Sequence, residues 1–219
     1  KWRTGDMIQH RITLVEGWTF ARFREALAQN DVLEHQLGDW TDAQIMDELG
    51  YQGVHPEGRF YPDTYQFTRG QSDLDILRLA GKRLHEVLES EWAQRTEGLP
   101  YASADQALVM ASIIEKETGV ASERPAIAGV FVRRLNKKML LQTDPTVIYG
   151  MGESYQGRIT RADLQRPTPY NTYVVAGLPP TPIAMVGRAA IHAALHPAEG
   201  DALYFVAKGD GSHQFSRTL

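Results

Sequence analysis

A strongly helical segment from Ser103 to Glu117 constrains the fold of this chain more than any other feature. Ser103 and Gln106 have the spacing of a capping box, which predicts that the helix begins there. At about 100° per residue, four apolar side chains fall on one narrow face of the helix: Ala107, Met110, Ala111 and Ile114. Such a stripe has to pack against a core, so the fold must be built around this helix.

Two glutamates follow the stripe and point in different directions. Glu117 lies about 60° from the centre of the apolar face, beside Met110 and Ile113, whereas Glu115 lies about 100° away on the other flank. A carboxyl group beside apolar side chains resists ionisation, so we expect a raised pKa for Glu117. A protonated carboxyl can donate the proton that cleavage of a glycosidic bond needs. The alternative is a solvated or lysine-paired glutamate near a helix end, which Gly119 is expected to close as a left-handed cap.

Composition excludes several classes of function. The net charge is −4 and no block of lysine and arginine occurs, so we expect no nucleic-acid partner. The absence of cysteine excludes disulfides and thiolate metal sites. Apolar residues make up 42% of the chain, which is ordinary for a globular protein with a core. No apolar run in the given sequence has the length of a membrane span, and we expect no signal peptide within it.

The order of the predicted elements indicates an α+β fold. We expect a strand over residues 10–16, an ordered loop over 51–67, and a hairpin formed by residues 203–207 and 214–217. Helices are predicted between the terminal strands, over residues 20–29, 41–49, 72–95, 103–117, 122–138 and 187–196, with a brief helix after Thr160. Because the strands do not alternate with helices, the sequence predicts a mainly helical domain with a groove and small β elements near both ends.

Two long irregular stretches, residues 139–158 and 166–186, follow the central helix. Long ordered loops in a compact domain are usually functional. These loops carry side chains that suit sugar rings, which have apolar faces and hydroxyl rims: Gln142, Asp144, Tyr149, Tyr155, Tyr170, Asn171 and Tyr173. The alternative is that the tyrosines fill space between the loops and the core.

Sequence signals for metals and cofactors are weak. His192 and His196 are spaced i, i+4, but no acidic residue separates them as in a zinc protease helix, so we interpret both as packing or capping residues. No Gly-rich nucleotide loop and no nucleophile-elbow serine occurs. We therefore expect no metal and no cofactor.

The order of several motifs resembles the bacterial endolytic murein transglycosylase family (MltG, YceG-like). The Glu-Lys-Glu run at 115–117 and the Gln-Thr-Asp-Pro-Thr run at 142–146 are the most specific of them. The resemblance rests on residues 14–17, 60–65, 111–118, 141–150, 170–173 and 177–180. It implies that Glu117, the second glutamate of the run, is catalytic, and it makes Gln142, Asp144, Tyr170, Asn171 and Tyr173 candidates for holding the glycan.

The resemblance also implies a reaction. It is the non-hydrolytic cleavage of the β-1,4 bond from N-acetylmuramic acid to N-acetylglucosamine within nascent peptidoglycan strands. The product would carry a 1,6-anhydromuramoyl end, and strand elongation would stop. A single carboxyl suffices in such a lyase because the C6 hydroxyl of the sugar is the nucleophile. Peptidoglycan strands would be the substrate, and penicillin-binding synthases would be the partners.

The family pattern further implies an arrangement in the cell. Residues 1–12 would be the tail of an upstream LysM-like module, and residues 13–219 the catalytic domain, with a C-terminal segment following. A preceding N-terminal anchor would make the protein a single-pass protein of the bacterial inner membrane, with its catalytic domain facing the periplasm.

Two other functions remain open from the residues. A muramidase-type hydrolase would need a second carboxylate near Glu117, and the candidates in the nearby loops are Asp144, Glu123 and Glu153. A non-catalytic peptidoglycan-binding scaffold would need no acid at all.

Overall fold

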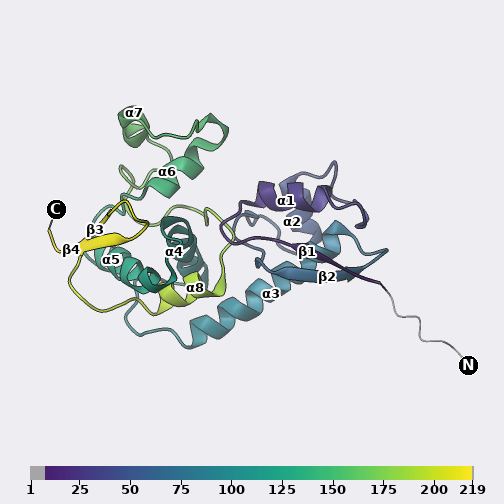
Figure 1. The fold of residues 1–219 in the computed structure, drawn as a ribbon, viewed down its shortest axis with the longest axis horizontal. Helices are drawn as coiled ribbons and strands as arrows, with labels where there is room; N and C mark the ends of the chain where they lie inside the picture. Colours follow the sequence, from purple (N-terminus) through teal and green to yellow (C-terminus); the bar gives the residue numbers. More distant parts are fainter. Residues whose placement is uncertain (1–7, 219) are drawn as a thin grey trace, which may run out of the picture.

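The structure is a computed structural model that describes residues 8–218, and it has the predicted α+β architecture (Figure 1). Two small antiparallel sheets lie near the two ends of the chain, with the helices between them. Two hydrophobic cores divide the fold into an N-terminal and a C-terminal lobe. The elements are, in order, β1 (Gln9–Thr13), α1 (Phe20–Ala28), α2 (Asp42–Glu48), β2 (Thr64–Thr68), α3 (Asp73–Ala93), α4 (Ala104–Glu117), η1 (Ala121–Glu123), α5 (Arg124–Asn136), α6 (Asp144–Met151), η2 (Gly152–Ser154), α7 (Arg161–Gln165), α8 (Arg188–Leu195), β3 (Tyr204–Ala207) and β4 (His213–Ser216).

The N-terminal lobe consists of β1, α1, α2, β2 and the first half of α3. β1 pairs antiparallel with β2, with Ile12 opposite Tyr65, and both side chains face the core. The helices begin where the sequence predicts. The Thr19 hydroxyl accepts a hydrogen bond from the amide of Arg22, and Thr41 forms a full capping box with Gln44.

β2 corrects the prediction of a loop over residues 51–67. The segment alternates regularly, with Tyr65 and Phe67 buried and Thr64 and Gln66 exposed. This period of two is typical of a half-buried strand. The surrounding glycines and prolines concealed it, because they are turn residues and the alternation covers only residues 64–68, at the end of the stretch.

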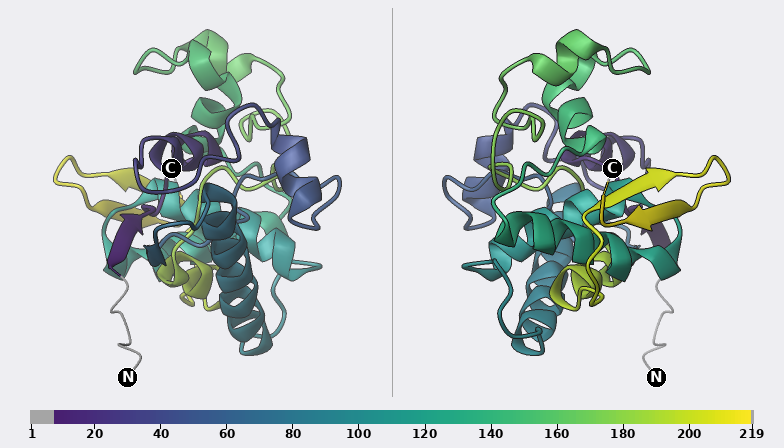
Figure 2. Two further views of the ribbon diagram at one scale, coloured as in Figure 1. Left: turned by 90° about the vertical axis from the view of Figure 1, so that its right-hand side faces the viewer. Right: turned by 90° about the vertical axis from the view of Figure 1, so that its left-hand side faces the viewer.

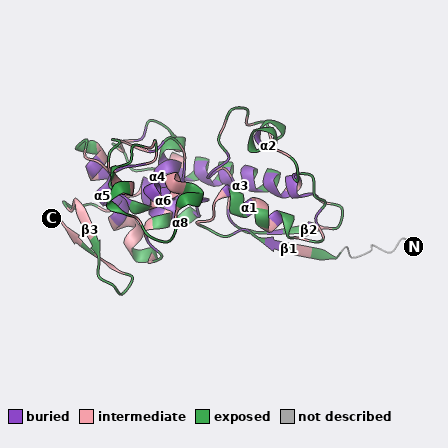
Figure 3. Ribbon diagram, turned by 90° about the horizontal axis from the view of Figure 1, so that it is seen from above, coloured by how far each residue is buried: buried purple, intermediate pink, exposed green. Residues whose placement is uncertain are grey.

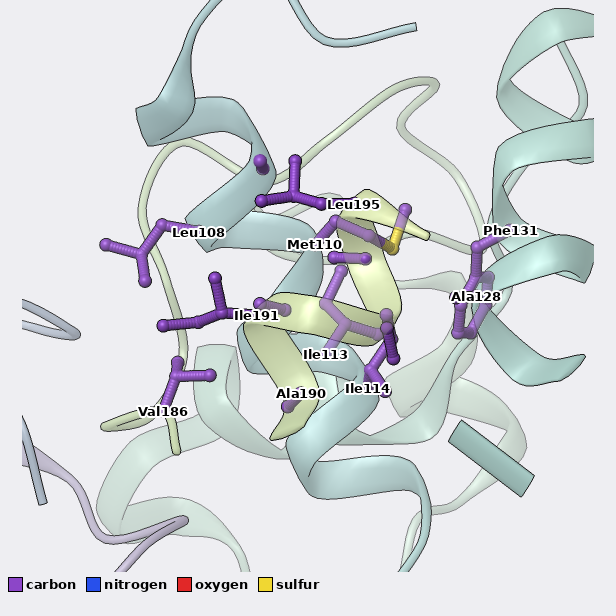
Figure 4. Close-up of a cluster of buried hydrophobic side chains, with 14 of the residues drawn as sticks. Leu108, Met110, Ile113, Ile114, Ala128, Phe131, Val186, Ala190, Ile191 and Leu195 are labelled. Atoms are coloured by element: carbon purple, nitrogen blue, oxygen red, sulfur yellow. The ribbon is translucent and has the colours of Figure 1, made fainter. Parts of the chain in front are cut away.

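The C-terminal lobe is built around α4, as the sequence predicts. α4 packs against α8, α5 and the second half of α3. Figure 4 shows the resulting core, in which Leu108, Met110, Ile113 and Ile114 of α4 meet Ile191 of α8. Every residue of α4 from Ala107 to Ile114 is buried, so the helix is enclosed on all sides rather than amphipathic.

Helix α3 belongs to both lobes. Its 21 residues span about 31 Å at 1.5 Å per residue. Leu74 and Leu77 near its start lie in the N-terminal core, whereas Leu84 and Leu88 lie in the C-terminal core, and Figure 3 shows this buried stripe running along the helix. Because one helix contributes to both cores, it fixes the distance between the lobes.

Two peripheral parts complete the fold. α6 and α7 stand above α4 and form a projection, and the β3–β4 hairpin packs beside α5 (Figures 1 and 2). The predicted capping box of Thr160 with Asp163 opens α7. In β3–β4, Phe205 pairs with Phe215. The projection and the hairpin border the cavities described below.

The prediction of a single-pass inner-membrane protein is wrong for the part of the chain that the structure describes. No helix within residues 8–218 combines the length and the apolarity that crossing a membrane requires. The one helix there with at least 18 residues, α3, carries acidic and basic side chains along its length. The expected division between residues 12 and 13 falls inside β1, and residues 1–7 of the expected LysM-like tail lie outside the described residues.

Candidate active site

Helix α4 carries Glu117 at its last position. Ser103 caps the first turn, since its hydroxyl accepts from the amide of Gln106 at 3.3 Å. The chain then leaves the helix through Thr118, which is extended at φ −142° and ψ 134°. This corrects the expected left-handed cap at Gly119: the Thr118 hydroxyl accepts from the amide of Val120 at 2.9 Å and turns the chain there. Glu117 is therefore held by a rigid helix at the edge of the C-terminal core.

Glu117 lies on the wall of a cavity of about 230 Å³. The wall is assembled from α4, α5, the segment around the start of α6, the loop before α8 and the β3–β4 hairpin. We call this cavity the Glu117 cavity, and its other lining residues are Arg134, Leu141, Gln142, Asp144, Tyr173, Phe205, Ala207 and His213. Polar and aromatic side chains thus surround one carboxyl group, the combination expected of a polar ligand site.

The surroundings of Glu117 favour its protonated form. Burial raises the pKa of the carboxyl above its usual range, and the nearby charge of Asp144 raises it further. A hydrogen bond from the Thr143 hydroxyl and the proximity of His213 act in the opposite direction. The direction of the pKa shift agrees with the expectation from the helical geometry. The carboxyl group is therefore suited to donate a proton.

Glu115 has a different environment, although it lies only two residues away. Its side chain is 6% exposed, and its Oε2 accepts from the backbone amide of Gly187 at 3.0 Å. Its Oε1 lies 3.5 Å from Nη2 of Arg124. These contacts join the end of α4 to the starts of α8 and α5. Glu115 is thus a structural residue, and only Glu117 faces the cavity.

The two irregular stretches meet beside Glu117 through a threonine pair. The amide of Thr143 donates to the hydroxyl of Thr172 at 3.1 Å, and the amide of Gln142 donates to the Thr172 carbonyl at 3.0 Å. The Tyr173 hydroxyl donates to Oδ1 of Asp144 at 2.5 Å. Three of the predicted glycan-binding residues, Gln142, Asp144 and Tyr173, therefore line the Glu117 cavity together.

Gln142 has an unusual backbone conformation. Its φ of 52° lies in the left-handed region, which residues other than glycine rarely adopt. Its Oε1 accepts from Nη1 of Arg134 at 3.3 Å, and the side chain is otherwise exposed. Such strain persists only where the surrounding structure imposes it, and it is concentrated at functional sites.

Tyr170 and Asn171, the other two predicted residues, lie elsewhere. Tyr170 lines a larger cavity of about 700 Å³, where its ring lies edge-on to the ring of Tyr149, with the two ring centroids 4.9 Å apart. Asn171 is 1% exposed. Its Nδ2 donates to the carbonyl oxygens of Leu164 and Arg166 at 3.1 and 2.7 Å. Asn171 therefore contacts the end of α7, and Tyr170 lies outside the Glu117 cavity.

The larger cavity lies between the lobes, on the other side of the α6 start from the Glu117 cavity. Both lobes line it, with Phe20 of α1 on one side and Ile148 of α6 on the other. Glu57 lies on its wall and is 4% exposed. The amide of Phe20 donates to Glu57 Oε1 at 2.9 Å, and the Tyr149 hydroxyl donates to Oε2 at 3.0 Å. Burial raises the Glu57 pKa to about 7.

The carboxylates considered for a hydrolase are distributed over three places. Asp144 lies in the Glu117 cavity, whereas Glu153 lines the larger cavity. Glu123 is hydrogen-bonded to His213: the backbone amide of His213 donates to Oε1 at 2.8 Å, and its Nδ1 lies 2.7 Å from Oε2. Asp144 is thus the one of the three that borders the same cavity as Glu117.

Arg134 and His213 were missed by the sequence reasoning. Both line the Glu117 cavity, at the C-terminal end of α5 and in β4. The sequence offers no signal for either, because Arg134 belongs to a basic helix end and His213 to a short hairpin strand. Only the docking of the hairpin places them beside Glu117.

Glu91, His192 and His196 are the described residues that come closest to a metal-binding group, with ligand atoms within 4.8 Å of one another. The oxygens of Glu91 lie 2.6 Å from Nε of Arg188 and 2.8 Å from Nδ1 of His192. The ring nitrogens of His196 lie 3.1 and 2.8 Å from the carbonyl oxygens of His192 and Gln94. These contacts fasten α8 to α3, in agreement with the predicted packing or capping role.

Known proteins resemble this chain over most of its length. The sequence profile of the YceG-like family matches residues 1–219. An endolytic murein transglycosylase of Bacillus subtilis (strain 168) is 42% identical over 183 residues, which cover 83% of this chain and 50% of the relative. An endolytic murein transglycosylase of Streptococcus pneumoniae (strain R6) is 36% identical over 158 residues, covering 69% of this chain and 28% of the relative.

A solved structure has the same fold. The crystal structure of a yceG-like protein from Listeria monocytogenes superposes with a TM-score of 0.76 at 34% sequence identity, covering 95% of this chain and 73% of the other. The chain spans half the length of the Bacillus relative and a smaller share of the Streptococcus relative.

Proposed function

The chain belongs to the YceG-like family, and we propose that it is an endolytic lytic transglycosylase acting on peptidoglycan. Two relatives carry the name endolytic murein transglycosylase. The observation that carries the proposal is the carboxyl group of Glu117, held in a polar cavity with its pKa raised by burial. The bond cleaved would be the β-1,4 linkage from N-acetylmuramic acid to N-acetylglucosamine within nascent strands.

Glu117 would perform both proton transfers. The protonated carboxyl donates to the glycosidic oxygen as the bond to the leaving sugar breaks. The C6 hydroxyl of the muramoyl residue then attacks C1, and the Glu117 carboxylate accepts the hydroxyl proton, which restores the acid. The product is a 1,6-anhydromuramoyl end. The reacting hydroxyl belongs to the same sugar, so no water has to be activated and no second carboxylate is required.

Thr143 would stabilise the ionised state of Glu117. Its hydroxyl donates to Oε1 and stabilises the carboxylate that forms after the first transfer. Asp144, accepting from the Tyr173 hydroxyl, would present its second oxygen to sugar hydroxyls, and Gln142 its amide nitrogen.

The remaining predicted residues would act farther from the bond. Tyr170, with Tyr149, offers an aromatic wall in the larger cavity, where a further part of the strand would lie. Asn171 would act indirectly, by holding the loop that carries Tyr173. Residues 13–219 would form the catalytic unit. Penicillin-binding synthases, which produce nascent strands, would be its partners.

The test is digestion of nascent-type glycan strands by the wild-type protein and by Glu117→Gln, with products identified by mass spectrometry. We expect internal fragments with anhydro ends from the wild type and a loss of at least 10²–10⁴-fold for the variant. Fragments heavier by one water would indicate a hydrolase instead. Cleavage by the variant at the wild-type rate would contradict the role of Glu117. Glu89→Gln, which removes a carboxylate at an exposed position of α3 outside both cavities, is the matched control and should retain activity.

A further inference from the structure

Arg134 is a buried arginine in the wall of the Glu117 cavity. Its side chain comes from α5 and the residue is 7% exposed. Nε donates to the Leu203 carbonyl at 2.7 Å. Nη1 donates to the carbonyls of Leu140 and Leu141, each at 3.0 Å, and to Gln142 Oε1 at 3.3 Å. The contacts of Nε and Nη1 therefore hold the guanidinium in one orientation.

The other terminal nitrogen of Arg134 has no acceptor among residues 8–218. Nη2 carries two of the five guanidinium hydrogens, and none of the hydrogen bonds in this part of the chain involves it. No carboxylate within the same residues lies within ion-pair distance of Arg134, whose charge meets only the ring face of Tyr204 at 4.9 Å. Nη2 is not one of the enclosed side-chain atoms that lack a partner in this part of the chain, so it is accessible, and a charged donor held on a cavity wall can bind a ligand acceptor.

The neighbouring Arg133 also has an Nη2 without an acceptor among residues 8–218, so what distinguishes Arg134 is its place on the wall of the Glu117 cavity. Its Nε donates to the Ala202 carbonyl at 2.7 Å and its Nη1 to the Ala198 carbonyl at 3.1 Å. Both arginines thus hold the chain that leads into β3. Only Arg134 lines the Glu117 cavity.

The charges of the cavity select the kind of acceptor. Glu117 and Asp144 line the same space, so an anionic ligand group would meet two carboxyl groups. A neutral carbonyl oxygen avoids that repulsion and still forms a charge-assisted hydrogen bond with the guanidinium. Among the neutral oxygens of a glycan strand, an acyl carbonyl oxygen is a stronger acceptor than a hydroxyl oxygen and has no hydrogen to turn towards the guanidinium, so an acyl oxygen fits this donor best.

We propose that Nη2 of Arg134 binds an acyl oxygen of the muramoyl residue that is cleaved. This assignment rests on the proposed function, which supplies the sugar. The muramoyl residue has two such oxygens, in the acetamido group at C2 and in the lactyl amide attached at C3. Arg134 is then a specificity-determining residue that distinguishes acylated from deacylated strands, and Glu117 acts on the bond that this contact positions.

The experiment measures binding without cleavage. Glu117→Gln protein, with and without Arg134→Lys, is titrated calorimetrically with three defined oligosaccharides: an intact glycan fragment, the same fragment after de-N-acetylation, and an N-acetylglucosamine oligomer that lacks the lactyl group. We expect Arg134→Lys to weaken binding of the intact fragment roughly 10–100-fold, because a hydrogen bond to a charged group is lost. It should not weaken binding of the fragment that lacks the contacted oxygen. The insensitive oligosaccharide thus identifies the acetamido or the lactyl oxygen.

Two further variants separate binding from folding. Arg133→Lys removes the same kind of carbonyl contacts outside the cavity and should leave all three affinities unchanged. Arg134→Gln, which keeps a neutral donor in the cavity wall, should reproduce the selective loss, and urea unfolding of both Arg134 variants shows that they fold.

Each remaining outcome overturns the assignment. Equal weakening on all three oligosaccharides by Arg134→Lys, or the same loss with Arg133→Lys, would reduce Arg134 to a structural residue. Binding of the intact fragment that neither cavity variant alters would overturn the assignment and leave the proposed function standing. If Glu117→Gln protein binds none of the three, the proposed function fails together with the assignment.

Discussion

Replacing Glu57 by glutamine should make the protein more stable at alkaline pH and less stable at acidic pH. Glu57 is 4% exposed, and burial raises its pKa from 4.5 to about 7, with the hydrogen bonds from Phe20 and Tyr149 opposing the shift. In the unfolded chain this carboxyl loses its proton near its ordinary pKa, whereas in the folded protein it keeps the proton up to a higher pH. Folding is therefore penalised wherever the unfolded state has already lost the proton.

The magnitude follows from the two pKa values. A difference of about 2.5 units, at 1.36 kcal/mol each, corresponds to roughly 3 kcal/mol. The penalty is absent below pH 4.5, grows between pH 4.5 and about 7, and is constant above. Glutamine stays neutral throughout but replaces one of the two carboxyl acceptors by an amide donor, which costs about 1 kcal/mol at every pH. Glu57→Gln should thus be about 2 kcal/mol more stable than wild type at pH 8 and about 1 kcal/mol less stable at pH 4.

Urea unfolding of both proteins between pH 4 and pH 8 measures how the order of their stabilities reverses with pH. Glu89→Gln, at an exposed position on α3, is the control and should follow the wild type at every pH. The informative quantity is the difference in the free energy of unfolding between variant and wild type. A difference for Glu57→Gln that is the same at pH 4 and pH 8 would refute the argument that burial in the wall of the larger cavity determines the Glu57 pKa.

Three further predictions concern the active site and the core. In the pH–rate profile of glycan cleavage, activity falls at high pH as Glu117 loses its proton. Asp144 raises the Glu117 pKa and the Thr143 hydroxyl lowers it, so Asp144→Asn should move this alkaline limb to lower pH and Thr143→Val should move it to higher pH. Shifts of both variants in the same direction would contradict the electrostatic reasoning. Leu108→Ala, at a fully buried position, should lower the free energy of unfolding by about 2–5 kcal/mol, and Leu79→Ala, at a 43% exposed position, by no more than about 0.5 kcal/mol, both measured by urea titration. Gly129→Ala should destabilise α5 by about 1–3 kcal/mol, because the added methyl meets the Ala198 carbonyl; a gain of about 1 kcal/mol, as expected from helix propensity alone, would show that the contact relaxes.

The helical part of the fold could be predicted because its signals are local. Thr19, Thr41, Ser72 and Thr160 stand at the starts of predicted helices, and the side chain of each caps the observed helix. A side-chain oxygen that bonds an amide three residues later depends on no distant contact. β2 was missed because a five-residue strand becomes stable only when it pairs, and its partner β1 lies more than fifty residues earlier.

The candidate site could be predicted only in part, for the same reason. Helical geometry predicted that Glu117 and Glu115 point in different directions, and only Glu117 lines the cavity, since an angle around a helix axis is fixed by residue spacing. Loop composition and the family resemblance nominated Asn171, and neither tells a loop residue that faces a cavity from one whose side-chain amide bonds nearby backbone carbonyls.

Arg133 and Arg134 show where residue spacing stops being informative. They are chemically identical neighbours, and each donates to carbonyl oxygens of the chain that leads into β3. What distinguishes them is the β3–β4 hairpin, which lies about seventy residues later and places Phe205, Ala207 and His213 over the Arg134 side only. The donor beside Glu117 is therefore created by the docking of that hairpin. Loosening the hairpin should weaken glycan binding through Arg134 without changing any residue that contacts Glu117.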